Sequence, residues 1–321
     1  MSETILKLVD LKQYYPLRGG LFSKTQYVHA VDGISLEVKA GETLGLVGES
    51  GCGKSSVGRT LLKLHEPTAG KIIYNGEDIT QFSASEMVSL RKEMQIIFQD
   101  PMESLNSRHT IGTILEEPFE IHGVGMSDER REWAKELLHK VGLPESAIDR
   151  YPHEFSGGQR QRIGIARAIA LNPKLIVCDE AVSALDVSVQ SQIINLLLQL
   201  QHQMNLALIF IAHDLSVVRH ISDRIAVMYL GRIVELSDTQ TLFANPQHPY
   251  TQALISAIPI PDPRQRAKRI MLEGDVPSPI NPPAGCHFAS RCSRAQNACT
   301  STYPDLVESA RNHFIACHLA N

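Results

Sequence analysis

No apolar run in this 321-residue sequence approaches the roughly 18 to 20 residues that a membrane-spanning helix needs. The first ten residues are mixed and charged, so they lack the cationic and apolar regions of a secretory signal. Neither sign of charge predominates, because 31 basic and 35 acidic residues give a formal net charge of −4. This balance argues against a nucleic-acid-binding surface. We therefore expect a soluble protein, or one that partners hold at a membrane.

Cysteine is scarce, with six residues, but four of them lie among the last 36 residues. Without an export signal the thiols are expected to stay reduced, so this group indicates metal ligation rather than a disulfide framework. Four thiolates suit an iron–sulfur cluster or zinc. Zinc sites favour cysteine pairs about two to four residues apart, and here five, six and seventeen residues intervene. Unligated thiols are the third alternative. The four are Cys286, Cys292, Cys299 and Cys317.

The composition, 43% hydrophobic, can supply the core of one large domain or two modest ones. Near the start, strands at 6–11 and 31–38 alternate well enough to predict an antiparallel edge sheet, with a surface loop at 18–26. Tyr14 and Tyr15 follow the first strand, where one aromatic face could stack on an adenine ring. Packing in the core is the alternative for both tyrosines.

The most informative motif is GESGCGKSS, which begins at Gly48. An apolar run predicts a strand before it, and an amphipathic pattern predicts a helix after it. The glycines let backbone N–H groups turn inward around a phosphate, and the helix start adds partial positive charge. Lys54 can then reach the outer phosphates, and Ser55 can offer its hydroxyl to Mg²⁺. The flanking strand and helix disfavour a mere glycine-rich turn with an incidental lysine.

A second apolar run, at 175–178, is typical of a parallel strand buried on both faces. It delivers Asp179 and Glu180 to its carboxyl end. Asp179 can hold Mg²⁺ through water, and Glu180 can accept a hydrogen bond from an attacking water. Asp186 follows and precedes a predicted helix at 187–203, for which it could be only the N-cap.

Two further strand ends carry polar residues. Gln99 follows a predicted strand at 94–98, and His213 follows one at 207–212. Such a residue is well placed to touch a metal or a nucleotide, although Gln99 could equally cap a turn. A single histidine is more often structural than catalytic, but the neighbouring strands carry the predicted magnesium and phosphate groups, which favours a role for His213.

A long helical pattern from about 111 to 171 interrupts the series of strands. Inside it, the pentapeptide FSGGQ at 155–159 directly precedes a helix. One hydroxyl, two glycines and a helix N-terminus describe an anion site. The alternative is a simple N-cap by Ser156, although the pentapeptide is more specific than a cap requires. Strands at 224–229 and 232–235 are expected to close the sheet.

In this order, over about residues 6–242, the motifs resemble those of an ABC-type ATPase. The glycine loop resembles Walker A, FSGGQ the signature, and the strand ending in Asp179 and Glu180 Walker B. The signature usually begins with leucine and here begins with Phe155. The resemblance implies Glu180 as catalytic base and His213 as the sensor of the γ-phosphate. The implied magnesium ligands are Ser55, Gln99 and Asp179. The implied ATP-binding residues are Tyr15, Gly48, Glu49, Ser50, Gly51, Cys52, Gly53, Lys54, Ser55, Ser56 and Gln99.

The same resemblance implies that two cassettes pack head to tail, so that ATP held by Lys54 of one is covered by the other. A signature within one chain would lie too far from its own phosphate loop to cover it. A site that is complete only when closed couples hydrolysis to movement. The residues implied to close over the partner's ATP are Ser156, Gly157, Gly158, Gln159 and Asp186.

The tail narrows the resemblance. NPQHPYT at 245–251, followed by Glu-Gly at 273–274 and Pro-Ser-Pro at 277–279, resembles the oligopeptide and dipeptide permease ATPases. Alanine at position 181, where most cassettes have proline, is similar to the F-type oligopeptide subunit. This resemblance implies a [4Fe–4S] cluster on the four C-terminal cysteines, with Zn²⁺ as the alternative, in a structural role.

The expected fold is therefore α/β. The resemblance implies a RecA-like P-loop core with an antiparallel β edge sheet, an α-helical subdomain at about 101–171 and a cysteine-containing C-terminal extension. We predict a nucleotide-binding domain at 1–244 and the extension at 245–321.

The implied function is ATP hydrolysis that powers peptide import from the cytoplasmic side of a bacterial inner membrane. The implied partners are two transmembrane permease subunits, a second ABC ATPase that is a paralogue, and indirectly an external peptide-binding protein, with no nucleic acid. Two alternatives are a non-transport ABC ATPase acting on ribosomes or DNA, and a redox-regulated ATPase switch that uses the cysteine tail. Tandem cassettes or a long coiled coil, which are usual in the first alternative, are absent from the sequence.

Overall fold

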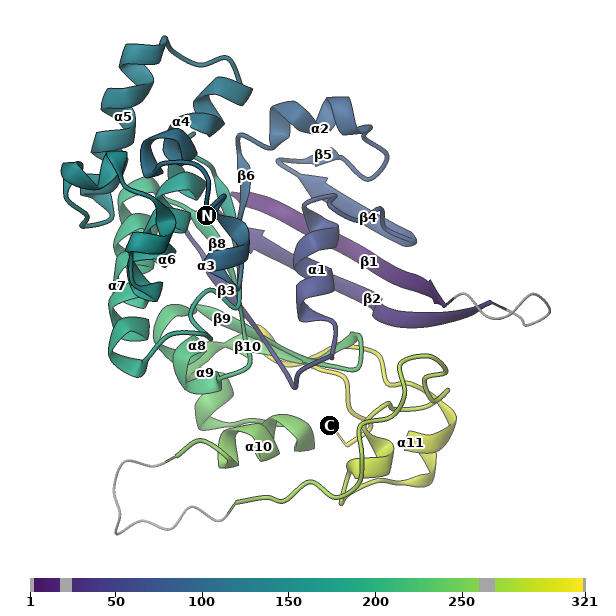
Figure 1. The fold of residues 1–321 in the computed structure, drawn as a ribbon. Coiled ribbons are helices and arrows are strands. Elements are labelled where there is room, and N and C mark those ends of the chain that lie inside the picture. Colours follow the sequence, from purple (N-terminus) through teal and green to yellow (C-terminus); the bar gives the residue numbers. More distant parts are fainter. Residues whose placement is uncertain (1–2, 18–24, 260–268, 320–321) are drawn as a thin grey trace. The chain divides into compact units, whose positions relative to one another are not determined.

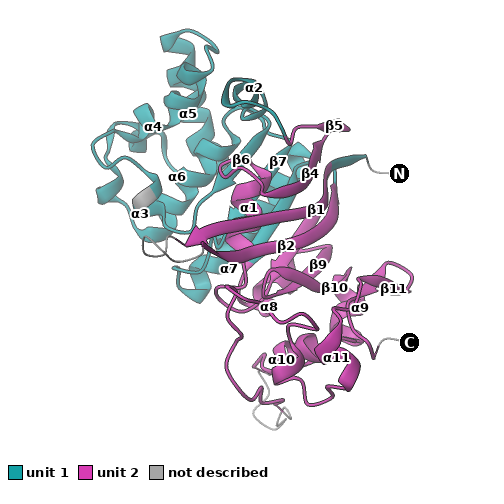
Figure 2. Cartoon of the chain, turned by 90° about the vertical axis from the view of Figure 1, so that its right-hand side faces the viewer, with its two compact units in different colours: residues 1–5, 39–42, 81–211 teal, residues 6–38, 43–80, 212–321 magenta. Residues whose placement is uncertain are grey.

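The computed structural model describes residues 3–17, 25–259 and 269–319. The chain divides into two compact units, which Figure 2 shows in different colours. Unit 1 comprises residues 1–5, 39–42 and 81–211, and unit 2 comprises residues 6–38, 43–80 and 212–321. Most of the loop expected at 18–26 lies outside the described residues.

Unit 1 is built around three parallel strands, β6 (Met94–Ile97), β7 (Leu175–Asp179) and β8 (Ala207–Ala212), with β7 between the other two. Every residue of β7 and β8 is buried, as the unbroken apolar runs predict. Because the strands are parallel, their carboxyl ends meet at one edge. Gln99 and Glu180 therefore leave the sheet on the same side.

Helices make up the rest of the described ordered structure of unit 1 (Figure 1). The helices α4 and α5 pack together through Phe119 and Trp133, whose rings lie 5.0 Å apart, while α6 packs on β6 and α7. The helical pattern predicted from 111 to 171 is confirmed. The bounds are α2 (Ala84–Leu90), α3 (Pro101–Ser104), α4 (Ile111–Ile121), α5 (Ser127–Lys140), α6 (Gly157–Ile169) and α7 (Val187–Met204), with 3₁₀ turns η1 (Glu145–Asp149) and η2 (Pro152–Glu154).

Unit 2 contains the predicted antiparallel edge sheet. The first strand of the chain is longer than the alternating pattern of the sequence indicated. It contains a bulge, because its register shifts between Val9 and Lys12 and Asp10 has a positive φ of 47°. A bulge of this kind reverses which side chains face inward, so the alternation in the sequence breaks there. In sheet order the strands are β2 (Gln26–Lys39), β1 (Thr4–Leu17), β4 (Ala69–Tyr74) and β5 (Glu77–Asp78).

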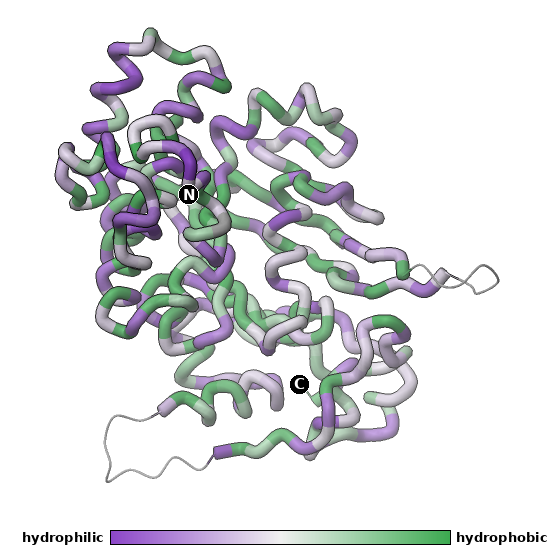
Figure 3. The backbone as a smooth tube through the Cα atoms, viewed as in Figure 1, coloured by the Kyte–Doolittle hydropathy of each residue, from purple (hydrophilic) through white to green (hydrophobic). Residues whose placement is uncertain are grey.

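A second group of strands in unit 2 carries the phosphate loop. β3 pairs in parallel with β9, β9 pairs antiparallel with β10, and β12 joins β10 to β11. All five residues of β3 are buried. Figure 3 shows hydrophobic residues along the central strands β3 and β9, and both hydrophobic and hydrophilic residues along the helices. The bounds are β3 (Thr43–Val47), β9 (Arg224–Tyr229), β10 (Arg232–Asp238), β11 (Val307–Ala310) and β12 (His313–Ile315).

The helices of unit 2 are short. The first follows the phosphate loop, and the last lies in the cysteine-containing segment. They are α1 (Lys54–Leu61), α8 (Leu215–Ile221), α9 (Thr239–Ala244), α10 (Pro249–Ser256) and α11 (Asn297–Ser301), with a 3₁₀ turn η3 (Ala289–Arg291). None of the described helices is both long and apolar enough to cross a bilayer.

The C-terminal residues pack into unit 2 through a buried polar network. Glu235 of β10 is fully buried, and its carboxylate lies 2.7 Å from Nε2 of His313 on β12. The same carboxylate accepts backbone N–H bonds from Gln247 and His248, at 2.7 and 3.0 Å. One side chain thus fixes both the start of α10 and the last strand. The residues on both sides of position 244/245 belong to unit 2. The two compact units therefore do not test the predicted domain boundary at 244/245, which stays a prediction.

We predict that Glu235→Ala lowers the free energy of unfolding by roughly 3–5 kcal/mol, because it leaves a buried histidine and two backbone donors without an acceptor. Urea unfolding followed by circular dichroism measures the change. Glu308→Ala on β11 is the matched control, since that exposed side chain bonds only the Asn312 amide. We expect about 1 kcal/mol or less for the control. Equal losses in both variants would contradict the role given to Glu235.

Candidate functional site

The phosphate loop connects β3 to α1 in unit 2. Gly53 is the N-cap of α1, with φ of 102°, and no side chain caps the helix. The first N–H groups of any α-helix have no carbonyl acceptor within the helix, which is the condition under which a helix start binds an anion. Ser55 and Ser56 lie half-buried in the first turn of α1.

Two of the loop glycines cannot be replaced without a clash. A Cβ on Gly48 would lie 2.1 Å from the Met228 carbonyl oxygen, and one on Gly53 would lie 1.9 Å from that of Ala30. Both contacts are with backbone, which cannot move aside as a side chain can. Gly51, with φ of 78°, meets nothing, so its requirement is the positive φ alone.

Lys54 extends back into the loop. Its side chain is buried, and Nζ donates to the carbonyl oxygens of Gly48 at 2.8 Å and Glu49 at 3.0 Å. A buried ammonium has to be satisfied by acceptors, and here main-chain oxygens of the loop provide them. The positive charge is thereby held where the sequence predicts the phosphates. Burial raises the pKa of Cys52 above its ordinary value, which favours its interpretation as a small loop residue with an inert thiol.

The two neighbouring tyrosines have different surroundings. The hydroxyl of Tyr14 donates to Asp32, and its ring stacks on His29 at 4.1 Å. Tyr15 is half-buried and makes an edge-on contact with His65 at 5.7 Å. This contact occupies at most one face of the Tyr15 ring. The arrangement agrees with Tyr15, rather than Tyr14, as the candidate adenine-stacking residue.

In unit 1 the two polar strand ends meet. Ile97 of β6 pairs with Cys178 of β7, and the Nε2 atom of Gln99 donates to Glu180 at 2.9 Å. Glu180 has a φ of 50°, an uncommon conformation for a residue other than glycine, and its N–H donates to Ile211 at 3.0 Å. Its carboxylate is thus aimed by the backbone and oriented by Gln99. Asp179, at the end of β7, is buried.

The FSGGQ stretch forms the start of α6. Ser156 and Gln159 make a reciprocal capping box, in which Ser156 N–H donates to Gln159 Oε1 at 3.0 Å and Gln159 N–H donates to the serine Oγ at 3.4 Å. The cap that the sequence left as an alternative is therefore present. Phe155 is buried, whereas Ser156 and Gly157 are exposed. A Cβ on Gly158 would lie 2.4 Å from a methyl group of Val189.

Two further candidates lie in loops before helices. Asp186 stands at the N-cap of α7 but makes no side-chain cap bond, and it is exposed. His213 is exposed after β8, while Asp214 caps α8 by accepting the Ser216 N–H at 2.7 Å. Their assigned roles stay predictions.

All six cysteines are free thiols. Cys178 is fully buried in β7, as expected of a core residue. Burial, with additions from the other three C-terminal thiols, raises the pKa of Cys286 to about 11. The backbone N–H of Cys286 donates to the Cys299 carbonyl oxygen at 2.8 Å, which places these two cysteines side by side. Even so, across the described ranges no three His, Cys, Asp or Glu side chains are arranged to hold a metal ion. The thiols as placed therefore do not fit a cluster or a zinc ion.

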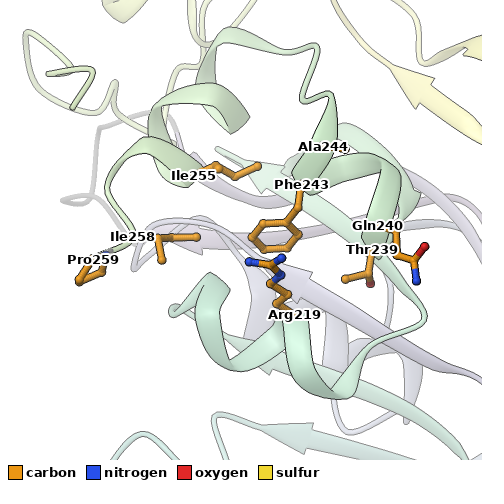
Figure 4. A pocket seen from close by; sticks show the side chains of 8 residues that line it. All are labelled: Arg219, Thr239, Gln240, Phe243, Ala244, Ile255, Ile258 and Pro259. Atoms are coloured by element: carbon orange, nitrogen blue, oxygen red, sulfur yellow. The ribbon is translucent and has the colours of Figure 1, made fainter. Parts of the chain in front are cut away.

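A cavity of about 750 Å³ lies among α8, α9 and α10 (Figure 4). The Arg219 guanidinium stacks on the Phe243 ring, 4.9 Å from its centre. None of the residues that line this cavity is a predicted nucleotide-binding residue. They are Arg219, Thr239, Gln240, Phe243, Ala244, Ile255, Ile258 and Pro259.

Two side chains that contact the phosphate loop were not predicted from the sequence. Tyr250 accepts the Glu49 N–H at 2.9 Å, and Arg291 pairs with the Glu49 carboxylate at 2.7 Å. Tyr250 lies in the NPQHPYT stretch, which indicated only a family. Nothing in the pattern around Arg291 distinguishes it from other arginines of the tail.

Comparisons with known proteins agree with this geometry. The ABC transporter family model matches residues 31–183. The dimeric post-hydrolysis structure of the ATP-binding cassette MJ0796, bound to ADP and Pi, is 28% identical with a TM-score of 0.66 over 73% of this chain and 99% of that one. For cbiO1 from Clostridium perfringens, part of the ABC transporter complex cbiONQ, the identity is 27% and the TM-score 0.65, over 76% and 92%. The fold is that of an ATP-binding cassette.

The likeness extends into the tail, where the model for the C-terminal region of oligopeptide/dipeptide transporters matches residues 234–299. The oligopeptide transport ATP-binding protein AppF of Bacillus subtilis (strain 168) is 56% identical over 99% of this chain and 98% of its own length. The dipeptide transport ATP-binding protein DppF of Haemophilus influenzae is 50% identical over 98% and 96%. The chain belongs to the oligopeptide/dipeptide family of ABC transporter ATP-binding proteins, which confirms the resemblance found in the sequence.

We predict that Lys54→Ala weakens MgATP binding tenfold to a hundredfold, as expected on losing hydrogen bonds from a charged donor worth about 1.5–3 kcal/mol. Isothermal titration measures the affinity. Lys71→Ala, at an exposed lysine of β4 in the same unit, is the control and should bind as the wild type does. Unchanged affinity in the Lys54 variant would remove the lysine from the phosphate site.

Proposed function

We propose that this chain is the ATP-hydrolysing subunit that powers import of oligopeptides or dipeptides through an ABC transporter. One observation carries the proposal. The likeness to oligopeptide and dipeptide transport ATP-binding proteins covers nearly the whole chain, including the C-terminal region, and is not confined to the part common to ATP-binding cassettes.

The phosphate loop would hold the triphosphate through backbone N–H groups and Lys54. Ser55, Gln99 and Asp179 offer hydroxyl, amide and carboxylate oxygens, which are the ligands that Mg²⁺ prefers. Bound Mg²⁺ would neutralise charge that develops on the transferred phosphoryl group. Glu180 would orient the attacking water, and its hydrogen bond from Gln99 at 2.9 Å supports this role by fixing the carboxylate. His213 would sense the γ-phosphate.

We propose that two such cassettes close over ATP, with the start of α6 facing the partner's nucleotide. The exposure of Ser156 and Gly157 supports this proposal, because a surface that closes on a partner has to be accessible before closure. The exposed Asp186, which makes no side-chain cap bond at the start of α7, is consistent with a contact made in the dimer. The second cassette would be a paralogue.

Two transmembrane permease subunits would receive the movement, and a peptide-binding protein outside the membrane would deliver the substrate. The chain would lie peripherally at the cytoplasmic side of a bacterial inner membrane. Neither alternative, a ribosome- or DNA-directed ATPase or a redox switch, has an observation that favours it. Co-purification from solubilised membranes separates the three, since permeases, ribosomes or DNA, and an electron-transfer protein are the respective partners.

For the transport role we predict that Glu180→Gln keeps MgATP binding and permease association but lowers kcat at least a hundredfold, the usual range for losing a positioned general base. Peptide uptake into cells that carry the variant should stop. Glu154→Gln, at an exposed carboxylate before α6, is the control and should transport normally. Brisk hydrolysis by the Glu180 variant would exclude it as the base, and normal uptake without any hydrolysis would contradict the transport proposal.

The four-cysteine cluster is a separate proposal that rests on the family resemblance alone, since the thiols as placed do not fit a metal ion. Protein purified without oxygen should be brown, with about four irons per chain for a cubane cluster. Cys292→Ser should lose the iron, whereas Cys52→Ser in the phosphate loop should retain it. Colourless protein with one zinc, or with no metal, would refute the cluster.

A further inference from the structure

The C-terminal extension makes two direct contacts with the phosphate loop, and both are with Glu49. The Tyr250 hydroxyl on α10 accepts the Glu49 backbone N–H at 2.9 Å. Arg291 in η3 donates through Nη1 and Nη2 to the two carboxylate oxygens of Glu49, at 2.7 and 3.1 Å. A bidentate guanidinium–carboxylate pair fixes orientation as well as distance.

Each of these contacts comes from a rigid support. Tyr250 is fully buried, with its ring 4.8 Å from Tyr229 and 5.4 Å from Phe288. The Arg291 N–H donates to the Phe288 carbonyl at 3.0 Å, and its side chain is only 8% exposed. The packed rings of Tyr229, Tyr250 and Phe288 therefore support both residues that contact Glu49, Tyr250 directly and Arg291 through the backbone of Phe288.

Glu49 also bonds to another residue of the phosphate loop. Its carbonyl oxygen accepts Lys54 Nζ at 3.0 Å, so the backbone N–H, the backbone carbonyl and the carboxylate are all engaged. Since the N–H bonds to Tyr250, it is directed away from the phosphate cradle. Glu49 thus links the extension to the lysine that holds the phosphates.

The ion pair of Arg291 and Glu49 also changes the net charge beside the phosphate loop. A carboxylate one residue from Gly48 would repel a triphosphate unless a cation neutralised it, and this repulsion is stronger in a partly desolvated site than in water. Arg291 provides that cation. A guanidinium stays protonated in proteins at neutral pH, so the arginine brings a full positive charge to the pair.

We propose that Arg291 and Tyr250 are positioning residues through which the C-terminal extension sets the geometry and charge of Glu49, and thereby the affinity of the phosphate loop for ATP. A pair that only fastens the tail would contribute to stability without altering nucleotide affinity. This inference rests on the proposed ATPase function. It assigns no ligand contact to Arg291 itself.

Nucleotide affinity and turnover in the full-length chain test the proposal. We expect Arg291→Ala to raise the Kd for MgATP about tenfold, as one unscreened charge near the site would do, with kcat changed less than threefold. Arg291→Lys should be intermediate, because lysine keeps the charge but not the bidentate geometry. Tyr250→Phe should weaken binding several-fold. Arg311→Ala, at an exposed arginine of the same segment, is the control and should match the wild type.

The decisive variant is the double substitution Arg291→Ala with Glu49→Gln. It removes the unpaired carboxylate, so it should restore affinity to within about threefold of the wild type if charge at Glu49 is the cause. Unchanged Kd in Arg291→Ala, or a double variant no better than the single one, would overturn the inference. Should Arg291→Ala not fold, Arg291→Lys alone decides in the same way. Failure of the wild type to bind MgATP would instead refute the proposed function.

Discussion

The structure depends on a loop whose backbone must stay open toward an anion while a lysine is held inside it. At Gly53 a Cβ would collide with the Ala30 carbonyl, so the approach of β2 to the loop is possible only without a side chain. Lys54 is buried against two main-chain oxygens, which keep its charge in place. The start of α1 and an oriented ammonium together provide a site that needs little rearrangement on binding.

Such a loop needs support, because glycine loses more conformational freedom on folding than any other residue. β3 and β9 hold it from the strand side, and the Gly231 N–H bonds to the Cys52 carbonyl at 2.9 Å. The rings of Tyr229, Tyr250 and Phe288 pack together beside the loop, and the Tyr250 hydroxyl accepts the Glu49 N–H. The C-terminal extension is therefore part of the same packed unit as the phosphate loop, and the buried Glu235–His313 pair fastens it there.

In unit 1 the pairing of the strands is what places the polar residues at the strand ends. Parallel pairing of β6 with β7 is enough to bring Gln99 within 2.9 Å of Glu180. The positive φ of Glu180 turns its side chain out of the strand direction, and the Ile211 carbonyl holds its N–H. The chemistry expected of Glu180 thus depends on the register of two buried strands. The start of α6 is stabilised locally by its capping box, so it can present the exposed Gly157 without unravelling.

Local patterns were sufficient to predict the strand, loop and helix around Gly48, the buried strand ending at Asp179, and the helical series from 111 to 171. In each case the information lies within a few consecutive residues, as a periodicity or as a need for glycine. The extension of β1 to Leu17 escaped prediction because a bulge breaks the alternation, and the geometry of the four cysteines does not follow from spacing. By itself the sequence determined the motifs, the strands and helices that carry them, and the family. It did not predict β11 and β12, which continue the sheet beyond β10, where it was expected to close. Only the tertiary structure decided that Tyr250 and Arg291 contact Glu49, since those pairs are 201 and 242 positions apart and no local pattern encodes a contact made by folding.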